Sequence, residues 1–340
     1  MQKKRIALVT GGYTDEFSIS LLSADFVVGL LDDTKYDVYK IVISEDRWAY
    51  IDDTQAAHPV NRADFSLRLP HEVIHFEVAF IMLHGIPGEN GCFQAYLELL
   101  GIPHTSCDAA TSAITMNKAY TKAVLADIDN LFVAKSVLIN RSQKSEAEQL
   151  ITERLSLPYF VKPNCSGSSI GMSTVGSQAE LRVALDRAFS TKNTGHQVLV
   201  EEFVTGREFS VGVFTRGNKA VVLPITEVIV ADGFFDYDAK YLSEVSHDMT
   251  PARLSLAQRS LVEEVVIAVY KRLACKGMVR VDFFLEDKTD NFYFIEINTI
   301  PGQTDHSFIP KQVRAAGMDL SLFYEELIEA AVAREIPFNE

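Results

Sequence analysis

The first third of the chain alternates between apolar strands and helices, and this order constrains the fold more than any other feature. KRIALVTGG is an apolar run that ends in a Gly-Gly turn, and YDVYKIVIS and FEVAFIMLHG are further runs of strand length. Between the first two lies SISLLSADFVVGLL, which has helical periodicity, and NGCFQAYLELLG predicts a second helix before a short strand, IPHTS. Strands that alternate with helices predict an open, mostly parallel sheet. Ligands of such sheets bind beyond the carboxyl ends of the strands, where Gly11-Gly12 and His84-Gly85 lie.

The remainder of the chain predicts an α+β arrangement. A helix over TMNKAYTKAVLADI is followed by the strand PYFVKP, the loop NCSGSSIG, the strand MSTV and a helix over residues 178–189. HQVLVEEFV and REFSVGVFT are strands around the turn TGR, and the last third contains an amphipathic helix and the strands MVRVDFFLE and NFYFIEINT. A chain of 340 residues holds two or three domains at roughly 150 residues each. We predict three units, over residues 1–108, 109–200 and 201–340.

Charge, hydropathy and cysteine usage exclude several classes of protein. The net charge is −14 without a dense Lys/Arg run, which argues against a nucleic-acid partner. No run is long enough to span a membrane, and the apolar stretch near the start covers only residues 6–9, too short for a secretory signal. The cysteines, at positions 92, 107, 165 and 275, form no C-x-x-C pair. We therefore expect reduced thiols, a cytoplasmic protein and no membrane partner.

Two acidic residues face each other in a predicted hairpin near the C-terminus. In VRVDFFLEDKTDNFYFIEIN, a turn centred on Thr289 sets Asp282 opposite Glu296 and Arg280 opposite Asn298, all on one face. Like charges directly opposite destabilise a hairpin, which indicates a cation between them. Carboxylate and amide oxygens suit Mg²⁺ or Mn²⁺, and Mg²⁺ is commonly shared with substrate phosphates. The alternative is a solvated polar face on an edge hairpin.

The serine- and glycine-rich loop NCSGSSIG follows a strand that ends near Lys162. Backbone N–H groups of such a turn, with a lysine beside them, can bind phosphate oxygens. The alternative is a plain connection between strands. In LVEEFVTGREFSV, backbone groups of Glu202 and Val204 can read an adenine edge and Glu208 can hold ribose hydroxyls, although this segment alone favours simple hairpin charges.

Six motifs, taken in order, resemble those of the D-alanine–D-alanine ligase family of ATP-grasp enzymes. They are GGYTDEFSIS, HGIPGENG, MNKAYTK, VKPNCSGSSIGM, YDAKY and RVDFFL…EINTIPGQTDHS, spread from Gly11 to Pro310. The resemblance implies an ATP-grasp fold with an N-terminal Rossmann-like parallel-sheet domain. Thr174 departs from the family pattern, where relatives often have Lys, and Cys165-Ser166 replaces a charged pair of some members. Both departures lie in the loop expected to close over the phosphates.

The resemblance also implies a mechanism: ATP activates the first D-alanine as an acyl phosphate, and the amine of a second D-alanine attacks it. It assigns two Mg²⁺ or Mn²⁺ ions to Asp282, Glu296 and Asn298. The residues implied for ATP are Lys118, Lys162, Ser169, Glu201, Glu202, Val204, Glu208 and Lys240. The product would be D-alanyl-D-alanine for peptidoglycan precursors, made in the cytoplasm by a homodimer.

Further residues are implied for the two amino acids and the transition state. Arg280 and the Gly302 N–H would stabilise the tetrahedral oxyanion, and Glu16, Ser168 and Tyr241 would form a hydrogen-bonded trio that closes the site. The residues implied for substrate are Glu16 for the first ammonium, Ser307 and Phe308 for the second substrate, and His84 with an undefined role.

Three other readings remain open at this point. The second substrate could be D-lactate or D-serine, or the chain could be an ATP-grasp carboxylate–amine ligase for different substrates. From another class, it could be an inactive nucleotide-binding module. The metal and lysine positions are all retained, which favours an enzyme.

Overall fold

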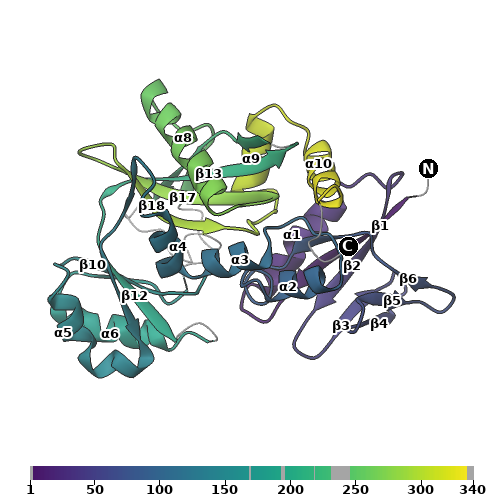
Figure 1. Cartoon of the computed structure of the whole chain (residues 1–340), viewed down its shortest axis with the longest axis horizontal. Coiled ribbons are helices and arrows are strands. Elements are labelled where there is room, and N and C mark those ends of the chain that lie inside the picture. The colour runs from purple at the N-terminus through teal and green to yellow at the C-terminus, as the bar shows by residue number, and fades with distance from the viewer. Residues whose placement is uncertain (1–2, 168–169, 193–195, 218, 231–245, 335–340) are drawn as a thin grey trace.

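The computed structural model describes residues 3–167, 170–192, 196–217, 219–230 and 246–334. Its strands form three sheets, and helices flank each of them (Figure 1). Within these residues, no helix is both long and apolar enough to cross a membrane.

The N-terminal sheet has seven strands in the order β6-β5-β4-β3-β2-β1-β7. Its strands are β1 (Lys4–Gly11), β2 (Tyr36–Ile43), β3 (Trp48–Ile51), β4 (Ala57–Asn61), β5 (Ser66–Arg68), β6 (Val73–Ile74) and β7 (Val78–Met82). The central β1 runs parallel to both β2 and β7, as predicted, and its residues 6–9 are fully buried because helices cover the sheet. The antiparallel extension β3–β6 was not predicted, and IPHTS forms only a single bridge, from His104 to Ala79.

Helices α1 (Phe17–Val28) and α2 (Cys92–Leu99) follow β1 and β7, as the pattern predicted. The next predicted helix is two helices, α3 (Ala109–Met116) and α4 (Lys118–Leu125). Asn117 separates them in an extended conformation, and its side chain accepts the Tyr120 N–H and caps α4. An asparagine that bonds the backbone locally favours a helix start over a helix interior.

The second sheet has four strands in the order β11-β10-β12-β9. They are β9 (Ser136–Asn140), β10 (Tyr159–Pro163), β11 (Ser173–Val175) and β12 (Gln197–Glu202). A separate core of buried apolar residues joins this sheet to α5 (Ala147–Thr152) and α6 (Gln178–Phe189), and the 3-10 helix η1 (Arg141–Glu146) precedes α5.

The third sheet has seven strands in the order β16-β15-β13-β17-β18-β8, with β14 paired to β13. They are β8 (Leu131–Val133), β13 (Gly206–Arg216), β14 (Lys219–Val222), β15 (Thr226–Val230), β16 (Ser246–Met249), β17 (Met278–Glu286) and β18 (Phe292–Asn298). The helices of this region are α8 (Leu256–Arg272), α9 (Phe308–Ala315) and α10 (Leu320–Val332). β12 and β13 do not pair with each other, although a hairpin was considered; they belong to different sheets.

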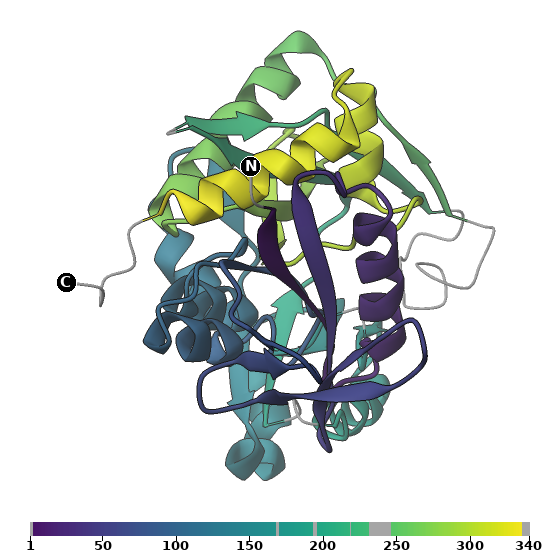
Figure 2. The same cartoon turned by 90° about the vertical axis from the view of Figure 1, so that its right-hand side faces the viewer.

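The C-terminal helix α10 returns to the N-terminal sheet. Its Tyr324 is fully buried and its ring lies 5.9 Å from that of Phe80 on β7, in the same core as β1. Figure 2 shows this helix, in yellow, lying across the purple N-terminal strands. The division into residues 1–108, 109–200 and 201–340 stays a prediction: β12 runs through its second boundary, and α10 shares the core of the first unit.

Candidate active site

A cavity of about 490 Å³ lies between the four-stranded sheet and the third sheet. This volume falls in the range of small-molecule sites, roughly 300–1,000 Å³. Of the residues predicted for ATP, metal or substrate, the following line it: Lys162, Glu201, Glu202, Val204, Glu208, Arg280, Asp282, Glu296 and Phe308. A second, much smaller hollow is lined by Lys118, Glu296 and Asn298. Most of the predicted site residues therefore line one of these two cavities, which share Glu296 as a lining residue.

The hairpin of β17 and β18 has the predicted register where it carries the acids. Asp282 pairs with Glu296 and Arg280 pairs with Asn298. Nearer the turn, Phe283 pairs with Phe294, one residue away from a symmetric hairpin, because a β-bulge interrupts the ladder beside Asp282. Bulges of this kind re-aim side chains and are common beside active sites.

Asp282 and Glu296 each have a cationic side chain beside them. Arg280 donates to Asp282 through Nε, at 2.9 Å from Oδ1, and through a terminal nitrogen, at 2.7 Å from Oδ2. Ser210 on β13 also donates to Asp282 Oδ1, at 2.6 Å. Lys118 Nζ lies 3.1 Å from Glu296 Oε2. Asn298 Nδ2 lies 3.4 Å from Asp282 Oδ2, which keeps the third predicted metal ligand next to the first.

These residues fit a hard cation by their chemistry. Two carboxylates and an amide supply only oxygen ligands, as Mg²⁺ and Mn²⁺ prefer. Within the described residues, no group of three or more His, Cys, Asp and Glu side chains is arranged to hold a metal by itself. An ion held here would therefore need oxygen atoms from a substrate as well, which is the usual situation for Mg²⁺ at phosphate sites.

Two lysines share one buried carboxylate on the opposite wall. Lys162 Nζ on β10 lies 2.6 Å from Glu201 Oε2 on β12, and Lys122 on α4 contacts Glu201 Oε1. Burial, with the charge of Lys118 next, lowers the pKa of Lys122 to about 7. Burial and the charges of Lys122 and Lys118 hold the pKa of Lys162 well below its usual range. This wall has two lysines for one carboxylate, and an anion bound beside them would favour their charged forms.

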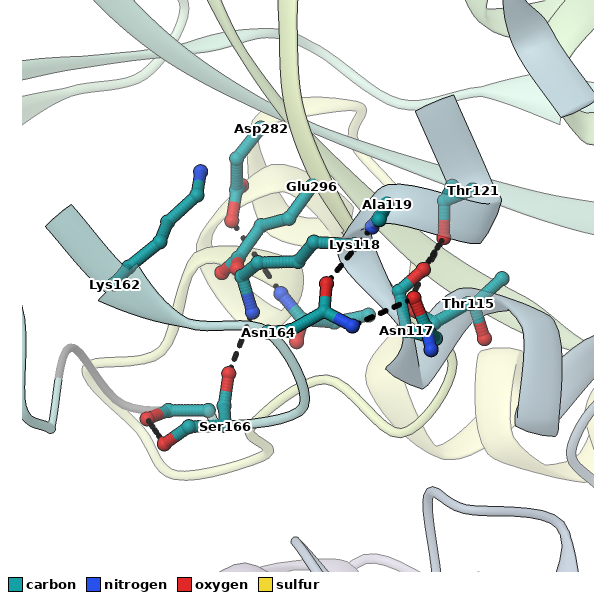
Figure 3. Close-up of polar contacts among 12 residues, drawn as sticks. Thr115, Asn117, Lys118, Ala119, Thr121, Lys162, Asn164, Ser166, Asp282 and Glu296 are labelled. Carbon is teal, nitrogen blue, oxygen red and sulfur yellow. Dashed lines mark hydrogen bonds and ion pairs between the residues drawn. The ribbon is translucent and has the colours of Figure 1, made fainter. Parts of the chain in front are cut away.

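Lys118 connects the two walls. Its ammonium donates to the Ser166 carbonyl oxygen at 2.5 Å and also pairs with Glu296. Figure 3 shows Lys118 and Lys162 directed toward the region of Asp282 and Glu296, with Asn164 bonded to Asn117 beneath them. Asn164 also accepts the Ala119 N–H, so the loop after β10 is tied to the start of α4.

Lys122 was not assigned a role from the sequence, although the motif MNKAYTK contains it. The available signal was its spacing: residues four apart on a helix share a face, so Lys118 and Lys122 point the same way. The pairing of Lys122 with Glu201 was not predictable, because it joins a helix and a strand far apart in sequence. Glu201, predicted to hold adenosine, is engaged with both lysines.

The segment between β12 and β13 forms the far end of the cavity. Residues 203–205 join the two sheets and line the space, together with the apolar side chains of Phe160, Met172 and Phe284. The Glu202 N–H donates to the Lys135 carbonyl oxygen at 3.0 Å. Glu208 lies on β13 opposite Val228 and Phe284. Apolar side chains on both sides of a space suit a planar ring; the adenosine assignments of Glu202, Val204 and Glu208 stay predictions, and all three residues line this cavity.

Glu16 lies at the carboxyl edge of the parallel sheet. A methyl group built on Gly85 would lie 2.8 Å from Glu16 Oε2, and one on Gly167 would lie 3.3 Å from Glu16 Oε1. The HGIPGENG loop and the serine-glycine loop therefore both approach this carboxylate. Glu89 of the first loop, which was not assigned a role, accepts the Gly85 N–H at 2.7 Å. Burial, then the charge of Glu16, raises the pKa of Glu89 to about 8.

His84 and Ser307 lie on either side of the loop that carries Gly302. His84 contacts Ser23 Oγ and the Ile300 carbonyl oxygen, each at 2.9 Å, and it is buried between α1 and this loop. Ser307 precedes α9 and its Oγ accepts the Thr304 N–H at 2.9 Å. A methyl group on Gly302 would lie 3.1 Å from Ser307 Oγ, so the two predicted groups are neighbours. Arg280 lies 5.8 Å from the Phe308 ring centre.

Ser168, Ser169, Lys240 and Tyr241 lie outside the described residues. The assignments of these residues, including the trio with Glu16, stay predictions.

Comparison with known proteins identifies the family. The models of the D-ala D-ala ligase N-terminus and C-terminus match residues 5–107 and 125–329. D-alanine--D-alanine ligase of Flavobacterium johnsoniae is 40% identical over 97% of this chain and 100% of its own length. That of Porphyromonas gingivalis strain W83 is 38% identical over 94% of this chain and 95% of its own length.

Solved structures agree with the sequence matches. The VanG D-Ala:D-Ser ligase from Enterococcus faecalis superposes with a TM-score of 0.85 at 31% identity, over 97% of this chain and 100% of that one. D-alanyl-alanine synthetase A from Vibrio cholerae gives 0.85 at 27% identity, over 98% and 100%. The predicted fold class, α/β and α+β in an ATP-grasp arrangement, is confirmed by these neighbours. The chain belongs to the D-alanine–D-alanine ligase family.

Proposed function

We propose that this protein joins two D-alanine molecules to D-alanyl-D-alanine at the expense of ATP, through a D-alanyl phosphate, for peptidoglycan precursors. The observation that carries the proposal is the cavity between two sheets, with buried lysines on one wall and paired carboxylates on the other, in a member of this family. Phosphoryl transfer requires positioning and charge neutralisation, which these two walls are suited to supply.

In the first half-reaction, the carboxylate oxygen of one D-alanine attacks the γ-phosphorus, and the bond to the ADP oxygen breaks. Lys162 lines the cavity and Lys118 lines the smaller hollow, and both would hold phosphate oxygens; Lys122 lies next to them, paired with Glu201. Asp282, Glu296 and Asn298 would hold Mg²⁺ or Mn²⁺, which neutralises phosphate charge when bound. The remaining phosphate contacts are proposed for Ser169 and Lys240.

The first D-alanine is proposed to bind at the edge of the N-terminal sheet. Glu16 would accept its ammonium, and the close approach of Gly85 and Gly167 to this carboxylate supports a small amino acid there. Ser168 and Tyr241 would complete the trio with Glu16 once the serine-glycine loop closes. Closure would keep water from the acyl phosphate.

In the second half-reaction, the neutral amine of the other D-alanine attacks the acyl carbonyl. The tetrahedral oxyanion would be stabilised by Arg280 and the Gly302 N–H before phosphate leaves. Ser307 is the N-cap residue of α9 and Phe308 is its first residue. The first-turn N–H groups of a helix favour an anion. We propose that the carboxylate of the second D-alanine binds at this helix end.

D-serine is a second candidate for the second substrate. It is favoured by the similarity to the E. faecalis structure, a D-Ala:D-Ser ligase, at a TM-score of 0.85. Incubation with equimolar D-alanine and D-serine, followed by product separation, would decide between them. We expect D-alanyl-D-alanine to predominate. The cytoplasmic location and the homodimer are proposed on the family membership alone.

The proposal is tested by mixing the purified protein with ATP, Mg²⁺ and D-alanine. One phosphate and one ADP should appear for each D-alanyl-D-alanine, and omission of Mg²⁺ or D-alanine should abolish all three. ADP release that is independent of D-alanine would contradict the proposal and favour a different carboxylate substrate. Binding of ATP without turnover would favour an inactive nucleotide-binding module.

A further inference from the structure

A chain of buried polar side chains joins α1 and the end of β7 to the loop of residues 299–307. Ser20 and Ser23 are fully buried one helical turn apart on α1, and both face His84. Ser20 Oγ accepts the His84 backbone N–H at 3.0 Å, and Ser23 Oγ contacts His84 Nε2 at 2.9 Å. Buried polar side chains stabilise a protein interior only when their polar atoms have hydrogen-bond partners.

The contacts define which nitrogen of His84 carries the proton. Nδ1 lies 2.9 Å from the Ile300 carbonyl oxygen, which can only accept, so Nδ1 is the donor. Ser23 Oγ accepts the Gln303 N–H at 3.2 Å and thus has its own proton to give. Nε2 then accepts a hydrogen bond from the Ser23 hydroxyl, and the Nδ1–H tautomer satisfies the contacts with Ser23 and Ile300.

Gln303 completes the chain on the far side of the loop. It is fully buried, its Nε2 donates to the Pro301 carbonyl oxygen at 3.1 Å, and its Oε1 accepts the Tyr324 hydroxyl at 2.7 Å. Tyr324 belongs to α10, which packs in the core of the N-terminal sheet. The side chain of Gln303 is therefore anchored to the core that also contains Ala24 and Val27 of α1, the helix that carries Ser23.

Gly302 lies between the two points at which this chain holds the backbone. The Ile300 carbonyl is bonded by His84, and the Gln303 N–H is bonded by Ser23. Only Pro301 and Gly302 separate these points, and Gly302 itself is less buried than either neighbour. A glycine has wide conformational freedom, so its orientation must come from its flanks.

We propose that Ser23, His84 and Gln303 are positioning residues that orient the Gly302 N–H toward the tetrahedral intermediate of the second half-reaction. The inference rests on the proposed function. It also gives His84 a defined role: it acts through the backbone of the Gly302 loop.

A positioning role predicts that dipeptide formation and ADP release become uncoupled, which a purely structural role does not predict. Formation of the acyl phosphate does not use the Gly302 N–H, whereas attack of the amine does. If the loop shifts, D-alanyl phosphate still forms, and water hydrolyses it to D-alanine and phosphate. ADP is then released without dipeptide, so the ratio of dipeptide to ADP falls below one.

The test compares Ser23→Ala and Gln303→Met with Ser112→Ala. Ser112 is a fully buried serine on α3 whose hydroxyl donates to the Cys107 carbonyl oxygen, so it is a matched control. We expect Ser23→Ala to lower dipeptide formation about 10- to 100-fold, since a displacement of about 1 Å can cost on the order of 10²-fold. ADP release should fall much less, and the KM for the first D-alanine should stay near that of the wild type.

His84→Asn and His84→Leu refine the test. An asparagine can still donate to the Ile300 carbonyl, whereas leucine cannot, so His84→Asn should keep the higher ratio of dipeptide to ADP. Thermal unfolding of each variant shows whether it is folded; if Ser23→Ala does not fold, Gln303→Met carries the measurement.

Two results would overturn the inference. In the first, the folded variants form one dipeptide for each ADP, as the wild type does. In the second, dipeptide and ADP formation fall by the same factor in the variants. A wild type that forms no dipeptide at all would instead refute the proposed function. These failures are therefore distinguishable.

Discussion

The two walls of the cavity use charged residues in opposite ways. On the wall of β10 and β12, Lys162 and Lys122 share the single carboxylate of Glu201, and all three side chains are buried. On the hairpin wall, Asp282 and Glu296 are paired across two strands; Arg280 contacts Asp282, and Lys118 contacts Glu296. The first wall has two lysines for one carboxylate, and the acids are directly opposed on the second.

The difference teaches how one cavity can bind both phosphate and a cation. Buried lysines that cannot all be neutralised by their neighbours gain from an anion, and opposed carboxylates gain from a cation. A nucleotide phosphate bound together with a divalent cation would supply the anion for the lysines and the cation for the carboxylates. Neither wall alone implies ATP, but the combination is complementary to a nucleotide with its metal.

The largest effect is expected when the lysine wall loses its carboxylate. Glu201→Gln leaves two buried lysines without a negative partner, and we expect about 3 kcal/mol of lost stability at pH 7. Because the pKa of Lys122 is already lowered to about 7, the unfolded chain binds more protons than the folded one between pH 7 and about 10. The contribution of Lys122 to stability therefore rises with pH in this window. The charge that Lys122 keeps at pH 7 is lost by pH 9, so the deficit caused by removing its negative partner should shrink at pH 9. Urea unfolding at both values measures it.

Glu77→Gln is the matched control for this experiment. Its carboxylate accepts the Arg5 backbone N–H at 2.8 Å, next to the N-terminal sheet and not in the lysine wall. We expect a loss of about 1 kcal/mol that does not depend on pH between 7 and 9. Equal losses for the two variants would show that the lysines do not depend on Glu201.

The next effect concerns the acidic wall. Glu296→Gln removes one of the two opposed carboxylates, and we expect kcat to fall at least about 100-fold, since even outer-shell changes at metal sites cost about 10- to 100-fold. The activity should be partly recovered at high Mg²⁺ if the metal is bound more weakly. Glu286→Gln, near the turn of the same hairpin, should leave both kcat and the Mg²⁺ dependence unchanged. A near-normal rate for Glu296→Gln would rule out the metal assignment.

The sequence predicted the register of this hairpin correctly at the acids and was wrong by one residue nearer the turn. The symmetric turn predicted the pairs at Asp282 and Arg280, which the structure confirms. It misplaced the pairs nearer the turn, where Phe283 meets Phe294, because a bulge is decided by backbone geometry and packing that residue counting does not contain. The error did not reach the site, since the acids lie on the side of the bulge away from the turn.

The lysine wall was less predictable for a different reason. Lys162 and Glu201 were both identified, but the contact between Lys122 and Glu201 depends on how α4 packs against β12. The helix itself was predicted as one segment and is broken at Asn117, whose local hydrogen bonding competes with helix continuation. The short strands β3–β6 were missed because they carry little apolar periodicity, and their pairing comes from the sheet edge that β2 offers.

A smaller effect should appear as proton uptake when ATP binds. Near pH 8, Lys122, with a pKa lowered to about 7, is largely neutral in the free protein. Phosphate oxygens nearby favour the charged ammonium and raise its pKa, so binding takes up protons and ATP affinity falls as pH rises above 7. Calorimetry at pH 8 in two buffers of different ionisation enthalpy measures the uptake.

Lys122→Met should lower that uptake, whereas Lys276→Met should not. Lys276 is half-exposed and pairs with Asp108 at 3.1 Å, away from the lysine wall. The same uptake in wild type and Lys122→Met would assign the proton to another group, such as Lys162.

The smallest effect is expected for Cys165, in the loop between the two walls. Burial raises the pKa of its thiol, although the Lys118 charge opposes this, so the reactive thiolate is scarce at neutral pH. Neither half-reaction needs a thiol, and serine has a similar size. Cys165→Ser should therefore keep kcat within about twofold of the wild type, as substitutions outside specific interactions do. A bulky alkylating reagent on the wild type should instead slow turnover, because added volume in this loop hinders its approach to Lys118, and ATP with Mg²⁺ should protect the thiol. Loss of activity in a folded Cys165→Ser variant would show that the thiol takes part in the reaction.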